Sequence, residues 1–449
     1  MNETIAAIAT PPGRGAVAIV RCSGPHARSI AARVFRSREP LADRVATYGT
    51  IVDRSGDVID RGLALAMDAP RTVTGEDVVE LHVHGSTIVV RETLRALLQA
   101  GARAAEPGEF TRRAFLNGKI DLSAAEAVAD IIAAESDAAL RAAQANLAGA
   151  LRDAIEEARR PLLAIVEELS GAIDYPDEIA EPRAATVREV LHAVDAALAA
   201  LEHDWERGRL IREGLSVAIV GPPNAGKSTL LNALLGEDRA IVSPWPGTTR
   251  DTIEESFVAD GILVRAIDTA GLRTGAEPIE RSGIERTRNA LATATLALVV
   301  IDGSEPLDTD AELALRETRA RPRVVLFNKS DRGGAGYAQR DEAERDALNG
   351  SAHDSTTVAA VRAAVARAAT NGITLDATRP HLASARHADA VARARAALAE
   401  ATATVDAGDP LDLAVPPLVA AVAALGEITG AEATEAILSG IFARFCVGK

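Results

Sequence analysis

The chain has 449 residues, which at roughly 150 residues per domain is enough for about three domains. Apolar residues make up 47% of it and charged residues 25%, a composition that excludes disordered, collagen-like and membrane-embedded classes. The formal net charge of −15 excludes nucleic-acid binding by overall positive charge, because phosphate binding needs clustered Lys and Arg. Any RNA role therefore needs a local basic patch or a partner.

The cysteines and the first residues point to the cytoplasm. Cys22 and Cys446 lie far apart, so no disulfide framework is expected and a reducing compartment fits. Residues 1–20 have no basic start and no unbroken apolar core, so we expect no signal peptide. The longest apolar run, 296–301, has the length of one buried strand, and we therefore expect no membrane span.

The apolar pattern divides the chain into four segments. Residues 1–118 read as mixed α/β, with strands expected at 5–9, 16–21 and 78–84. Three further segments follow, with long helices, then alternating strands and helices around a largely parallel sheet, then helices again: 119–213, 214–375 and 376–449. Each helical segment alone is poor in apolar bulk. We therefore expect the two helical segments to pack together, with the α/β domain inserted between them.

Two local signals mark helix ends in the first helical segment. Ser123 followed by Glu126 predicts a capping box at a helix start. Tyr175-Pro176-Asp177-Glu178 predicts the end of the long helical run.

A phosphate-binding loop is predicted in the α/β domain. Gly221-Pro222-Pro223-Asn224-Ala225-Gly226-Lys227-Ser228 follows the strand expected at 215–220 and opens a helix, which is the context that this motif requires. The glycines let backbone N–H groups turn toward phosphate oxygens, and the helix N-terminus adds a positive dipole end. We expect Lys227 to reach the terminal phosphates and Ser228 to ligate magnesium.

Two later motifs predict that the nucleotide is GTP. Asp268-Thr269-Ala270-Gly271 supplies a carboxylate near the metal and a glycine N–H that can sense a third phosphate. Asn328-Lys329-Ser330-Asp331 follows another apolar strand, and the Asp331 carboxylate can accept from N1–H and the 2-amino group of guanine. Adenine lacks both donors and would leave a buried carboxylate unpaired.

The residue that positions the attacking water is not the glutamine of Ras-like switches, because Leu272 follows Gly271. Candidates lie downstream, and each of them is alternatively part of a solvated helix face: Arg273, Glu277, Glu280 and Arg281. Upstream, residues 243–251 have the Pro and Gly content of a switch loop, with a threonine able to reach magnesium.

The lysines indicate a second site. Of 49 basic residues 45 are Arg, and the four lysines should lie where a compact ammonium is needed: Lys119, Lys227, Lys329 and Lys449. Two of these belong to the nucleotide motifs. Elsewhere, Glu80, His82 and His84 share one face of an expected strand, which suits a metal, a polar sheet face, or a carboxylate presented to a ligand. Cys446 is either a reactive thiol or a small buried group.

Four separate blocks show that the chain resembles the MnmE (TrmE) family of tRNA-modification GTPases over essentially its whole length: 9–15, 74–77, 107–119 and the ending Phe445-Cys446-Val447-Gly448-Lys449. The resemblance implies an N-terminal dimerising domain that binds a formyl-tetrahydrofolate (1–118), a helical domain in two parts (119–213 and 376–449), and an inserted Ras-like GTPase domain (214–375). The fold class expected is thus multidomain, α/β plus α.

The same resemblance implies residue roles at the matching positions. The GTP-binding set is Asn224, Ala225, Gly226, Lys227, Ser228, Thr229, Ser243, Thr248, Thr249, Asp268, Thr269, Ala270, Gly271, Asn328, Lys329, Asp331, Ser351 and Ala352. The catalytic residues are Glu280, Asn224 and Lys227, with Glu280 placing the water. The implied magnesium ligands are Ser228 and Thr249. The implied potassium ligands are Asn224, Ser243, Trp245 and Thr248. The folate residues are Arg21, Glu80, Lys119 and Lys449.

The activity implied is GTP hydrolysis coupled to addition of an aminomethyl or carboxymethylaminomethyl group at C5 of the wobble uridine of certain tRNAs. The implied partners are a second copy of the chain, tRNA, and the FAD-dependent protein MnmG (GidA), in a heterotetramer. The implied cofactors are GTP, Mg²⁺, K⁺ and 5-formyltetrahydrofolate or a related one-carbon folate. Two alternatives remain at this point: a GTP-dependent assembly switch without modification chemistry, and a stand-alone folate enzyme with a regulatory GTPase.

Overall fold

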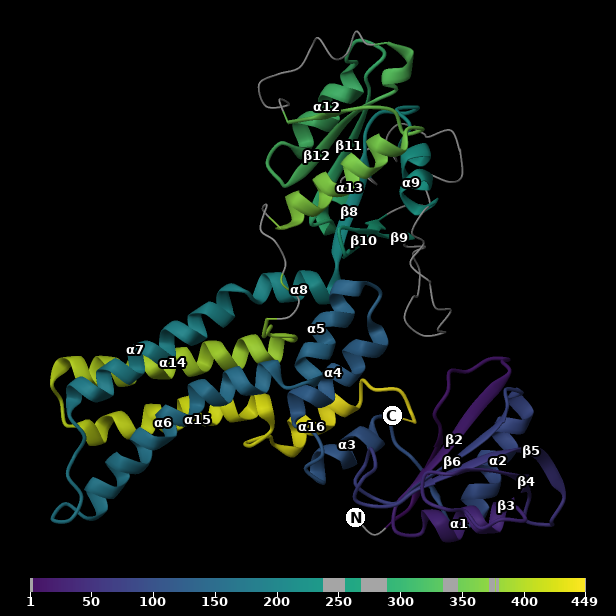
Figure 1. The fold of residues 1–449 in the computed structure, drawn as a ribbon. Helices are drawn as coiled ribbons and strands as arrows, with labels where there is room; N and C mark the ends of the chain where they lie inside the picture. The colour runs from purple at the N-terminus through teal and green to yellow at the C-terminus, as the bar shows by residue number, and fades with distance from the viewer. Residues whose placement is uncertain are drawn as a thin grey trace. The chain divides into compact units, whose positions relative to one another are not determined.

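The computed structural model describes residues 3–236, 255–267, 289–333, 346–370, 376 and 379–448 (Figure 1). It divides the chain into two compact units, and each unit combines segments that are distant in sequence. The first contains Met1–Ala129, Ile155–Arg188 and Ala396–Lys449, and the second contains Asp130–Ala154 and Glu189–Arg395. This division passes through long helices, so the helical segments contribute to both units. The domain limits given above stay predictions.

The first unit contains a seven-stranded sheet in the order β3-β4-β5-β6-β2-β1-β7. Neighbouring strands are antiparallel except for the parallel pair β1 and β7. The strands are β1 (Ile5–Ile8), β2 (Val17–Ser23), β3 (Phe35–Arg36), β4 (Ala46–Val52), β5 (Val58–Met67), β6 (Val78–His84) and β7 (Arg103–Ala104). The three strands predicted in this region are confirmed within two residues at each end.

Two helices cover one face of this sheet, and a third helix covers the part of the other face near β1. Val79, Leu81 and Val83 of β6 are buried in the core with α1 (Ala27–Val34) and α2 (Thr87–Gln99), as their alternation predicts. On the opposite face, α3 (Glu109–Leu116) places Phe110 against Ile5 and Ala7 of β1. Further along that face, Tyr48 and Leu63 lie opposite each other on β4 and β5 and stay 65% and 39% exposed.

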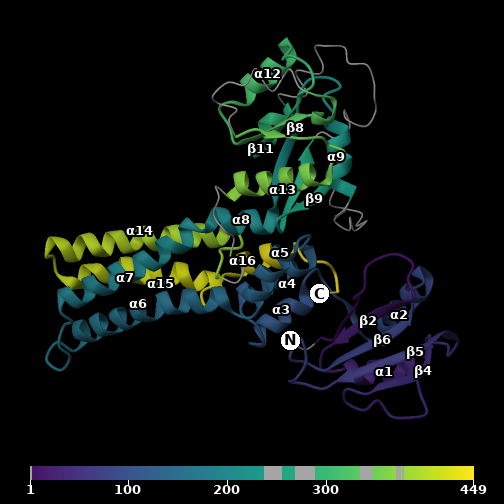
Figure 2. The ribbon, with the colours of Figure 1, turned by 45° about the horizontal axis from the view of Figure 1, so that its top comes forward.

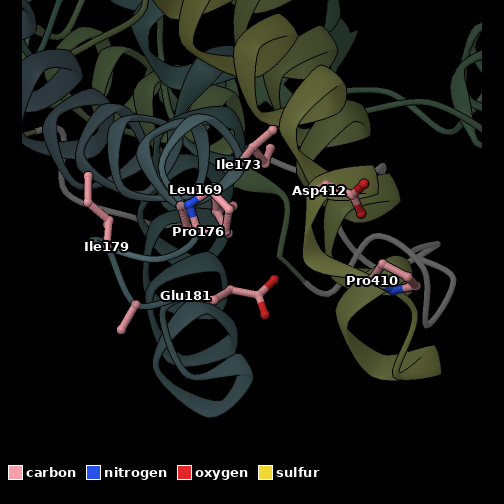
Figure 3. A pocket seen from close by; sticks show the side chains of 9 residues that line it. Leu169, Ile173, Pro176, Ile179, Glu181, Pro410 and Asp412 are labelled. Atoms are coloured by element: carbon pink, nitrogen blue, oxygen red, sulfur yellow. The ribbon is translucent and has the colours of Figure 1, made fainter.

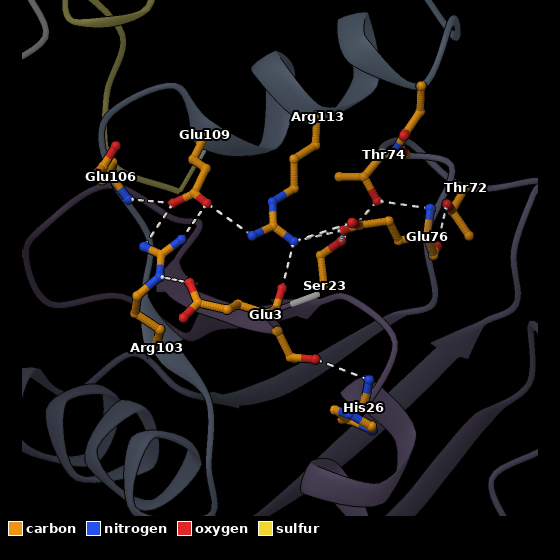
Figure 4. A network of polar contacts seen from close by, with 12 residues as sticks. Glu3, Ser23, His26, Thr72, Thr74, Glu76, Arg103, Glu106, Glu109 and Arg113 are labelled. Carbon is orange, nitrogen blue, oxygen red and sulfur yellow. Dashed lines mark hydrogen bonds and ion pairs between the residues drawn. The ribbon is translucent and has the colours of Figure 1, made fainter. Parts of the chain in front are cut away.

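A buried polar network attaches α3 to the sheet (Figure 4). Arg113 of α3 is 1% exposed, and its guanidinium donates to Glu109 Oε1 at 2.9 Å and to Glu76 Oε2 at 3.0 Å. Glu76 also accepts from Ser23 of β2 at 2.9 Å, and Glu109 accepts from Arg103 at 2.6 Å. Because a buried charge is tolerated only when it is paired and hydrogen-bonded, these contacts fix α3 and the 74–77 loop at one place.

The predicted start of one helix and the predicted end of another lie close to the observed positions. The start has a different cap from the one predicted. The helix α4 is Leu122–Ala133, and the carboxylate of Asp121 accepts from the Ala124 N–H at 3.0 Å and from the Ser123 hydroxyl at 2.5 Å. The predicted capping box with Ser123 is therefore wrong: the helix starts two residues earlier, which puts Asp121 at the N-cap. The long helix α6 (Ala150–Asp174) ends directly before Tyr175, as predicted.

The two helical segments pack together, which confirms that one helical domain is built from both flanks of the inserted one. Leu122 and Ala125 of α4 share a core with Leu438 and Phe442 of the C-terminal helix α16 (Glu435–Phe442). Arg395 of α14 donates to Asp195 of α7 at 2.8 Å. The remaining helices are α5 (Asp137–Leu147), α7 (Ala184–His203), α14 (Ala385–Ala407), η4 (Leu411–Ala414) and α15 (Val415–Thr429). Figure 2 shows α7 running beside α14, where Arg188 donates to Asp406, and α6 running beside α15, where Arg159 donates to the carbonyl oxygen of Val422.

One segment has a longer apolar stretch than the sequence pattern indicated. Leu411–Thr429 is long and apolar enough to cross a membrane by length and composition alone. Half of its apolar window is buried inside the protein, where Leu418, Leu425 and Ile428 of α15 are fully covered. A buried core helix of a bundle has the same composition, so this segment is weak support for a membrane span.

The second unit contains a six-stranded sheet in the order β13-β12-β11-β8-β10-β9, parallel except for β9. The strands are β8 (Leu215–Val220), β9 (Glu255–Ala259), β10 (Ile262–Ile267), β11 (Leu296–Asp302), β12 (Arg323–Asn328) and β13 (Leu348–Asn349). One face packs on α9 (Lys227–Gly236) and α13 (Ser355–Thr370), and the other on α12 (Thr309–Thr318). This is the Ras-like sheet that was predicted, entered from α8 (Trp205–Glu213).

The polar network predicts a pH-dependent contribution to stability. Burial disfavours the charged form of Glu109, but hydrogen bonds from Arg103, the Glu106 N–H and Arg113 outweigh it and hold its pKa below the usual range. A lowered pKa in the folded state stabilises the protein above the unfolded value of about 4.3, and this stabilisation is lost as the pH falls through the folded pKa. We expect Glu109→Gln to lower the free energy of unfolding by about 1–3 kcal/mol at pH 7.

The measurement is urea unfolding of wild type and Glu109→Gln between pH 7 and pH 3, with Glu106→Gln as the control because that side chain is exposed. The difference between Glu109→Gln and wild type should shrink as the pH falls, since a protonated carboxyl resembles the amide. A difference that stays constant over this range would contradict the assignment.

Candidate functional site

The phosphate loop lies at the carboxyl edge of the second sheet, between β8 and α9. Gly221 has φ +145°, and a Cβ there would lie 2.0 Å from the carbonyl oxygen of Val300 on the neighbouring strand. Gly226 has φ +96°, and a Cβ there would lie 2.2 Å from Nδ2 of Asn328. Both positions therefore require glycine, and together they keep the loop tight against the sheet.

Lys227 lies at the end of this loop where α9 begins, and Asn224 lies near its middle. The Lys227 ammonium donates to the carbonyl oxygens of Gly221 at 2.9 Å and Pro222 at 2.7 Å, and burial lowers its pKa. It is thus held over the loop, where a compact ammonium reaches phosphate oxygens. Asn224 is exposed at the loop tip and has a left-handed backbone, φ +59°, which Asn tolerates better than most residues.

The predicted base-binding motif lies beside the phosphate loop, and one side chain joins them. Asn328, at the end of β12, donates from Nδ2 to the carbonyl oxygen of Ala225 at 2.8 Å. Its Oδ1 accepts from the N–H of Ala352 at 2.8 Å. Asn328 is 2% exposed, so both halves of its amide are satisfied inside the protein. The structure thereby brings together three predicted parts of the GTP site.

Asp331 lies at the mouth of the site in the short 3₁₀ helix Ser330–Arg332. Its carboxylate is exposed, and a hydrogen bond from Ser351 is the main cause that lowers its pKa. It is therefore ionised and accessible at neutral pH. Ser351 and Ala352 are buried beside it, in the loop that follows the two-residue strand β13.

Asp302 is a polar residue at this edge that the sequence analysis did not assign. It ends β11 directly opposite Asn328, and its Oδ2 lies 2.6 Å from Nζ of Lys329. Ser304 donates to its Oδ1 from both the hydroxyl, at 2.6 Å, and the backbone N–H, at 3.0 Å. Burial disfavours its charged form, but these hydrogen bonds and Lys329 keep its pKa low. A signal was present, since Asp302 ends the apolar strand next to the one that carries Asn328.

Two further predicted residues of the nucleotide site lie next to the phosphate loop, and the others lie outside the described residues. Ser228 and Thr229 are partly buried in the first turn of α9. The residues that lie outside the described part of the chain are Ser243, Trp245, Thr248, Thr249, Asp268, Thr269, Ala270, Gly271 and Glu280. The same applies to Lys449 of the second predicted site.

The second predicted site has an ion pair on the N-terminal sheet. Arg21 of β2 lies directly opposite Glu80 of β6, and its Nε donates to Glu80 Oε1 at 2.9 Å. The guanidinium also stacks over the ring of Phe110, 5.8 Å from its centroid. The remaining Glu80 oxygen lies 3.2 Å from His82 Nε2. Glu80 is thus oriented by two neighbours from the sheet.

His84 takes no part in this cluster, because its Nδ1 lies 2.8 Å from Asp60 Oδ1 on β5. Among the described residues, the structure has no group of three or more His, Cys, Asp or Glu side chains arranged for a metal ion. Glu80, His82 and His84 therefore read as a polar sheet face or as a carboxylate presented to a ligand.

Val447 and Gly448 lie against the N-terminal domain. Val447 pairs with Pro107, and a Cβ on Gly448 would lie 2.1 Å from the carbonyl oxygen of Ile8, which neighbours Val20 on β2. Lys119 is exposed, and its Nζ donates to the carbonyl oxygen of Pro70 at 2.9 Å. Cys446 is exposed, whereas Cys22 is buried and its pKa is raised to about 12 by desolvation.

Comparisons with known proteins cover the whole chain. A model of the GTP-binding protein TrmE N-terminus matches residues 4–119, and a model of the MnmE helical domain matches residues 122–446. The tRNA modification GTPase MnmE of Chloroflexus aurantiacus is 44% identical over 456 residues and that of Symbiobacterium thermophilum 46% over 463, each with 100% of both chains covered. The MnmE of Streptococcus pneumoniae is 39% identical, covering 100% of this chain and 99% of its own.

Two solved structures share a smaller part. The FeoB G-domain of Methanococcus jannaschii is 23% identical and covers 35% of this chain and 98% of its own, with a TM-score of 0.25. Era of Aquifex aeolicus bound to GDP and AlF4⁻ is 25% identical and covers 41% and 66%, also with a TM-score of 0.25.

The full-length matches define a GTPase that acts in tRNA modification, with its phosphate-loop domain inserted between helical segments. The chain belongs to the MnmE (TrmE) family of tRNA modification GTPases.

The contact between Asp302 and Lys329 leads to a prediction about nucleotide affinity. Asp302→Asn keeps the acceptor for Ser304 but removes the charge that holds Lys329, so we expect the Kd for GDP to rise about tenfold, which corresponds to about 1.4 kcal/mol. The measurement is titration calorimetry with GDP.

Asp308→Asn is the matched control, because Asp308 caps α12 in the same domain and Asn is an equally good cap. The melting temperatures of both nucleotide-free variants should match wild type. A GDP affinity of Asp302→Asn equal to that of the control would show that Lys329 needs no such support.

Proposed function

We propose that this GTPase works with the FAD-dependent protein MnmG (GidA) to add a carboxymethylaminomethyl or aminomethyl group at C5 of the wobble uridine of certain tRNAs. The observation that carries the proposal is the assembled nucleotide site in a chain of this family. Asn328 joins the phosphate loop to the base loop, and Lys227 lies over the phosphate side. An acidic chain binds RNA poorly by itself, so MnmG supplies much of the tRNA-binding affinity of the complex.

Deletion of the gene should abolish the wobble-uridine modification, as measured by nucleoside mass spectrometry of total tRNA. Wild type should restore it. Lys227→Ala should not, because the ammonium that reaches the terminal phosphates is lost. The control is Lys119→Ala assayed for GTP hydrolysis, which should stay normal because Lys119 lies on the N-terminal sheet. Full modification in the deletion strain would instead favour an assembly switch without modification chemistry.

Guanine recognition falls to the loop after β12. The ionised Asp331 carboxylate faces solvent at the site mouth, where it can accept from N1–H and the 2-amino group of guanine. Ser351 orients it, and the N–H of Ala352 is tied to Asn328. The arrangement favours GTP over ATP because adenine offers no matching donors.

Magnesium and potassium fit the oxygen donors at the phosphate loop. The Ser228 hydroxyl lies in the first turn of α9, where a magnesium ligand is needed, and Thr249 is its proposed companion. The exposed, left-handed Asn224 offers an amide oxygen at the loop tip. With Ser243, Trp245 and Thr248 it would hold potassium, which supplies positive charge at the phosphates. Glu280 is proposed to place the attacking water.

We expect GTP hydrolysis to be at least about tenfold faster in potassium chloride than in sodium chloride at equal ionic strength, as a cation that stabilises transition-state charge should produce. Asn224→Ala should lose this difference while still binding GDP, since the loop glycines and Lys227 remain. The measurement is phosphate release by purified protein. Equal rates in both salts would remove potassium from the mechanism.

The Arg21–Glu80 pair supports a folate site on the N-terminal domain. The Glu80 carboxylate is oriented by Arg21 and His82 and can accept from the amino and ring N–H groups of a pteridine. Lys119 and Lys449 would pair with the carboxylates of the folate tail. Gly448, which directly precedes Lys449, lies against β1 of the sheet that carries Arg21.

Glu80→Gln should weaken binding of 5-formyltetrahydrofolate about tenfold or more, because an amide presents one acceptor oxygen where the carboxylate presents two. Asp60→Asn is the control, since Asp60 pairs with His84 on the same sheet. Titration calorimetry gives both affinities. A Glu80→Gln variant that binds as tightly as the control would move the ligand away from this face.

The exposed part of the N-terminal sheet supports a homodimer. Tyr48 and Leu63 form an exposed cross-strand pair on the face that α1 and α2 leave open, and Val17 of β2 is 60% exposed. Exposed apolar side chains on a sheet are typical of protein interfaces. A second copy of the chain is the proposed occupant, and the cytoplasm is the proposed location.

A further inference from the structure

Outside the two candidate sites, segments that are distant in sequence meet at two places. One is a hollow at the end of α6, where Leu169 and Ile173 lie near Pro410 and two carboxylates, Glu181 and Asp412, stand at the rim (Figure 3). The other is the place where the chain enters and leaves the inserted α/β domain, at α8. This second place is linked by direct contacts to the nucleotide-binding sheet.

The segment by which the chain leaves this domain, 381–383, is tied to the helix by which the chain enters it. Arg212, in the last turn of α8, donates from Nη1 to the carbonyl oxygen of Ala383 at 2.6 Å. Gly208, about one turn earlier, lies so close that a Cβ there would be 2.9 Å from the carbonyl oxygen of Leu382. Leu382 itself is fully buried. The two connections therefore cannot separate without breaking these contacts.

The first helical segment is bound to the same place. Nε of Arg212 donates to Oδ1 of Asp130 on α4 at 2.8 Å, so one guanidinium joins α4, α8 and the segment 381–383. Asn146 of α5 is 4% exposed and donates to the carbonyl oxygen of His381 at 3.4 Å. A planar guanidinium with five fixed donors is suited to hold several segments at once. We name the following residues the insertion joint: Asp130, Asn146, Gly208, Arg212 and 381–383.

Both α8 and α5 also contact the nucleotide-binding sheet. Leu210 of α8 packs against the core of this sheet. Gly214, which follows α8, has φ +77°, and a Cβ there would lie 2.5 Å from the carbonyl oxygen of Leu263 on β10. Gly261, in the turn before β10, faces α5, because a Cβ there would lie 3.8 Å from the Cβ of Ala138. These contacts seat both helices against β10 and the turn that precedes it.

The strand β10 connects this packing to the nucleotide. It ends at Ile267, directly before the predicted motif Asp268-Thr269-Ala270-Gly271, where a change in the third phosphate acts first. Packed elements transmit a displacement because protein interiors are barely compressible. The division into compact units agrees, since residues 130–154 belong to the unit that contains this sheet.

We infer that the insertion joint makes α5, α8 and the segment 381–383 part of the body that moves when the nucleotide state changes. They shift together with β10, and the chain does not bend at the predicted domain limits, 213/214 and 375/376. Arg212 is the positioning residue that holds this body together. The inference requires only that the chain binds guanine nucleotides, and it is independent of the proposed tRNA chemistry, partner and folate.

The test is the distance between spin labels on α5 and α12, measured by double electron–electron resonance. The labels are attached at the exposed positions Gln144→Cys and Glu312→Cys in full-length Cys446→Ser protein, where the buried Cys22 stays unlabelled. Excess unlabelled protein is added so that distances within one chain dominate. With GDP and with a non-hydrolysable GTP analogue, the account predicts one narrow distance distribution with the same mean.

Arg212→Met keeps most of the apolar stem but removes both hydrogen bonds. It should broaden the distribution about twofold and make its mean depend on the nucleotide, because the joint then opens locally. Arg209→Met is the matched control, since Arg209 of the same helix pairs with Glu206 and Glu213 of α8 itself, and it should behave as wild type. GTP hydrolysis should be unchanged in both variants.

Gly208→Ala tests the joint by a second route. Ala favours a helix over Gly, so this substitution would raise the melting temperature at an open helical position. Here it should lower the melting temperature and broaden the distribution, because the Cβ meets the carbonyl oxygen of Leu382. Gly440→Ala is the control: Gly440 lies in α16, a Cβ there meets nothing within 4 Å, and the melting temperature should rise.

Two results would overturn the inference. If the wild-type distance changes between GDP and the GTP analogue, the bend lies between α5 and the sheet, and the helices do not belong to the moving body. If Arg212→Met and Gly208→Ala both give the narrow, unchanged distribution of wild type, the joint does not hold these segments. Calorimetry with GDP shows that every variant binds nucleotide, so neither result arises from an empty site.

Discussion

The side-chain amide of Asn328 connects the two halves of the nucleotide site. Its donor side holds the phosphate loop through Ala225, and its acceptor side holds the base loop through Ala352. Both bonds are buried, so breaking either one would leave an unsatisfied polar group, at a cost of about 1–3 kcal/mol. Gly226 must lack a side chain because Asn328 occupies that space. The distance between phosphate and base contacts is thereby fixed before a nucleotide arrives.

Elsewhere in the chain, ion pairs and hydrogen bonds to charged side chains fix the positions of the residues at the two candidate sites. Lys329 is held by the carboxylate of Asp302 and Arg21 by that of Glu80, whereas Lys227 donates to neutral carbonyl groups of its own loop. In the N-terminal domain, the buried Arg113 ties α3 to β2 and to the 74–77 loop through Glu76 and Glu109. A buried charge has a narrow range of acceptable positions, because only a complete set of partners offsets its desolvation. These networks therefore place the two candidate sites on rigid elements.

The sequence predicted what local pattern and motif spacing determine. The buried strand at 215–220, the period-two strand at 78–84 and the joining of the two helical segments all appear in the structure. Motif order also predicted that Asn328 and the phosphate loop belong to one nucleotide site, since parallel strands bring their carboxyl ends to one edge. The direct opposition of Arg21 and Glu80 depends on strand register across 59 residues, which periodicity leaves open.

Other features followed from tertiary context. The helix after residue 119 begins one residue before the predicted cap, and Asp121 takes the role given to Ser123, since either side chain can accept from a helix N-terminus. Asp302 carried a usable signal in its position at a strand end, but its partner Lys329 lies 27 residues away. The turn after α6 depends on how residues 175–179 fold over Gly171, a packing detail that no motif encodes.

The most direct test of the central constraint is GDP affinity of the isosteric variant Asn328→Asp, measured by calorimetry beside the melting temperature of the nucleotide-free protein. The carboxylate keeps the acceptor for the Ala352 N–H but sets an oxygen against the carbonyl oxygen of Ala225. We predict a rise in Kd of at least about tenfold, because a lost buried hydrogen bond is worth more than 1 kcal/mol, with secondary structure retained. A GDP affinity equal to wild type would show that the two loops hold their positions without Asn328.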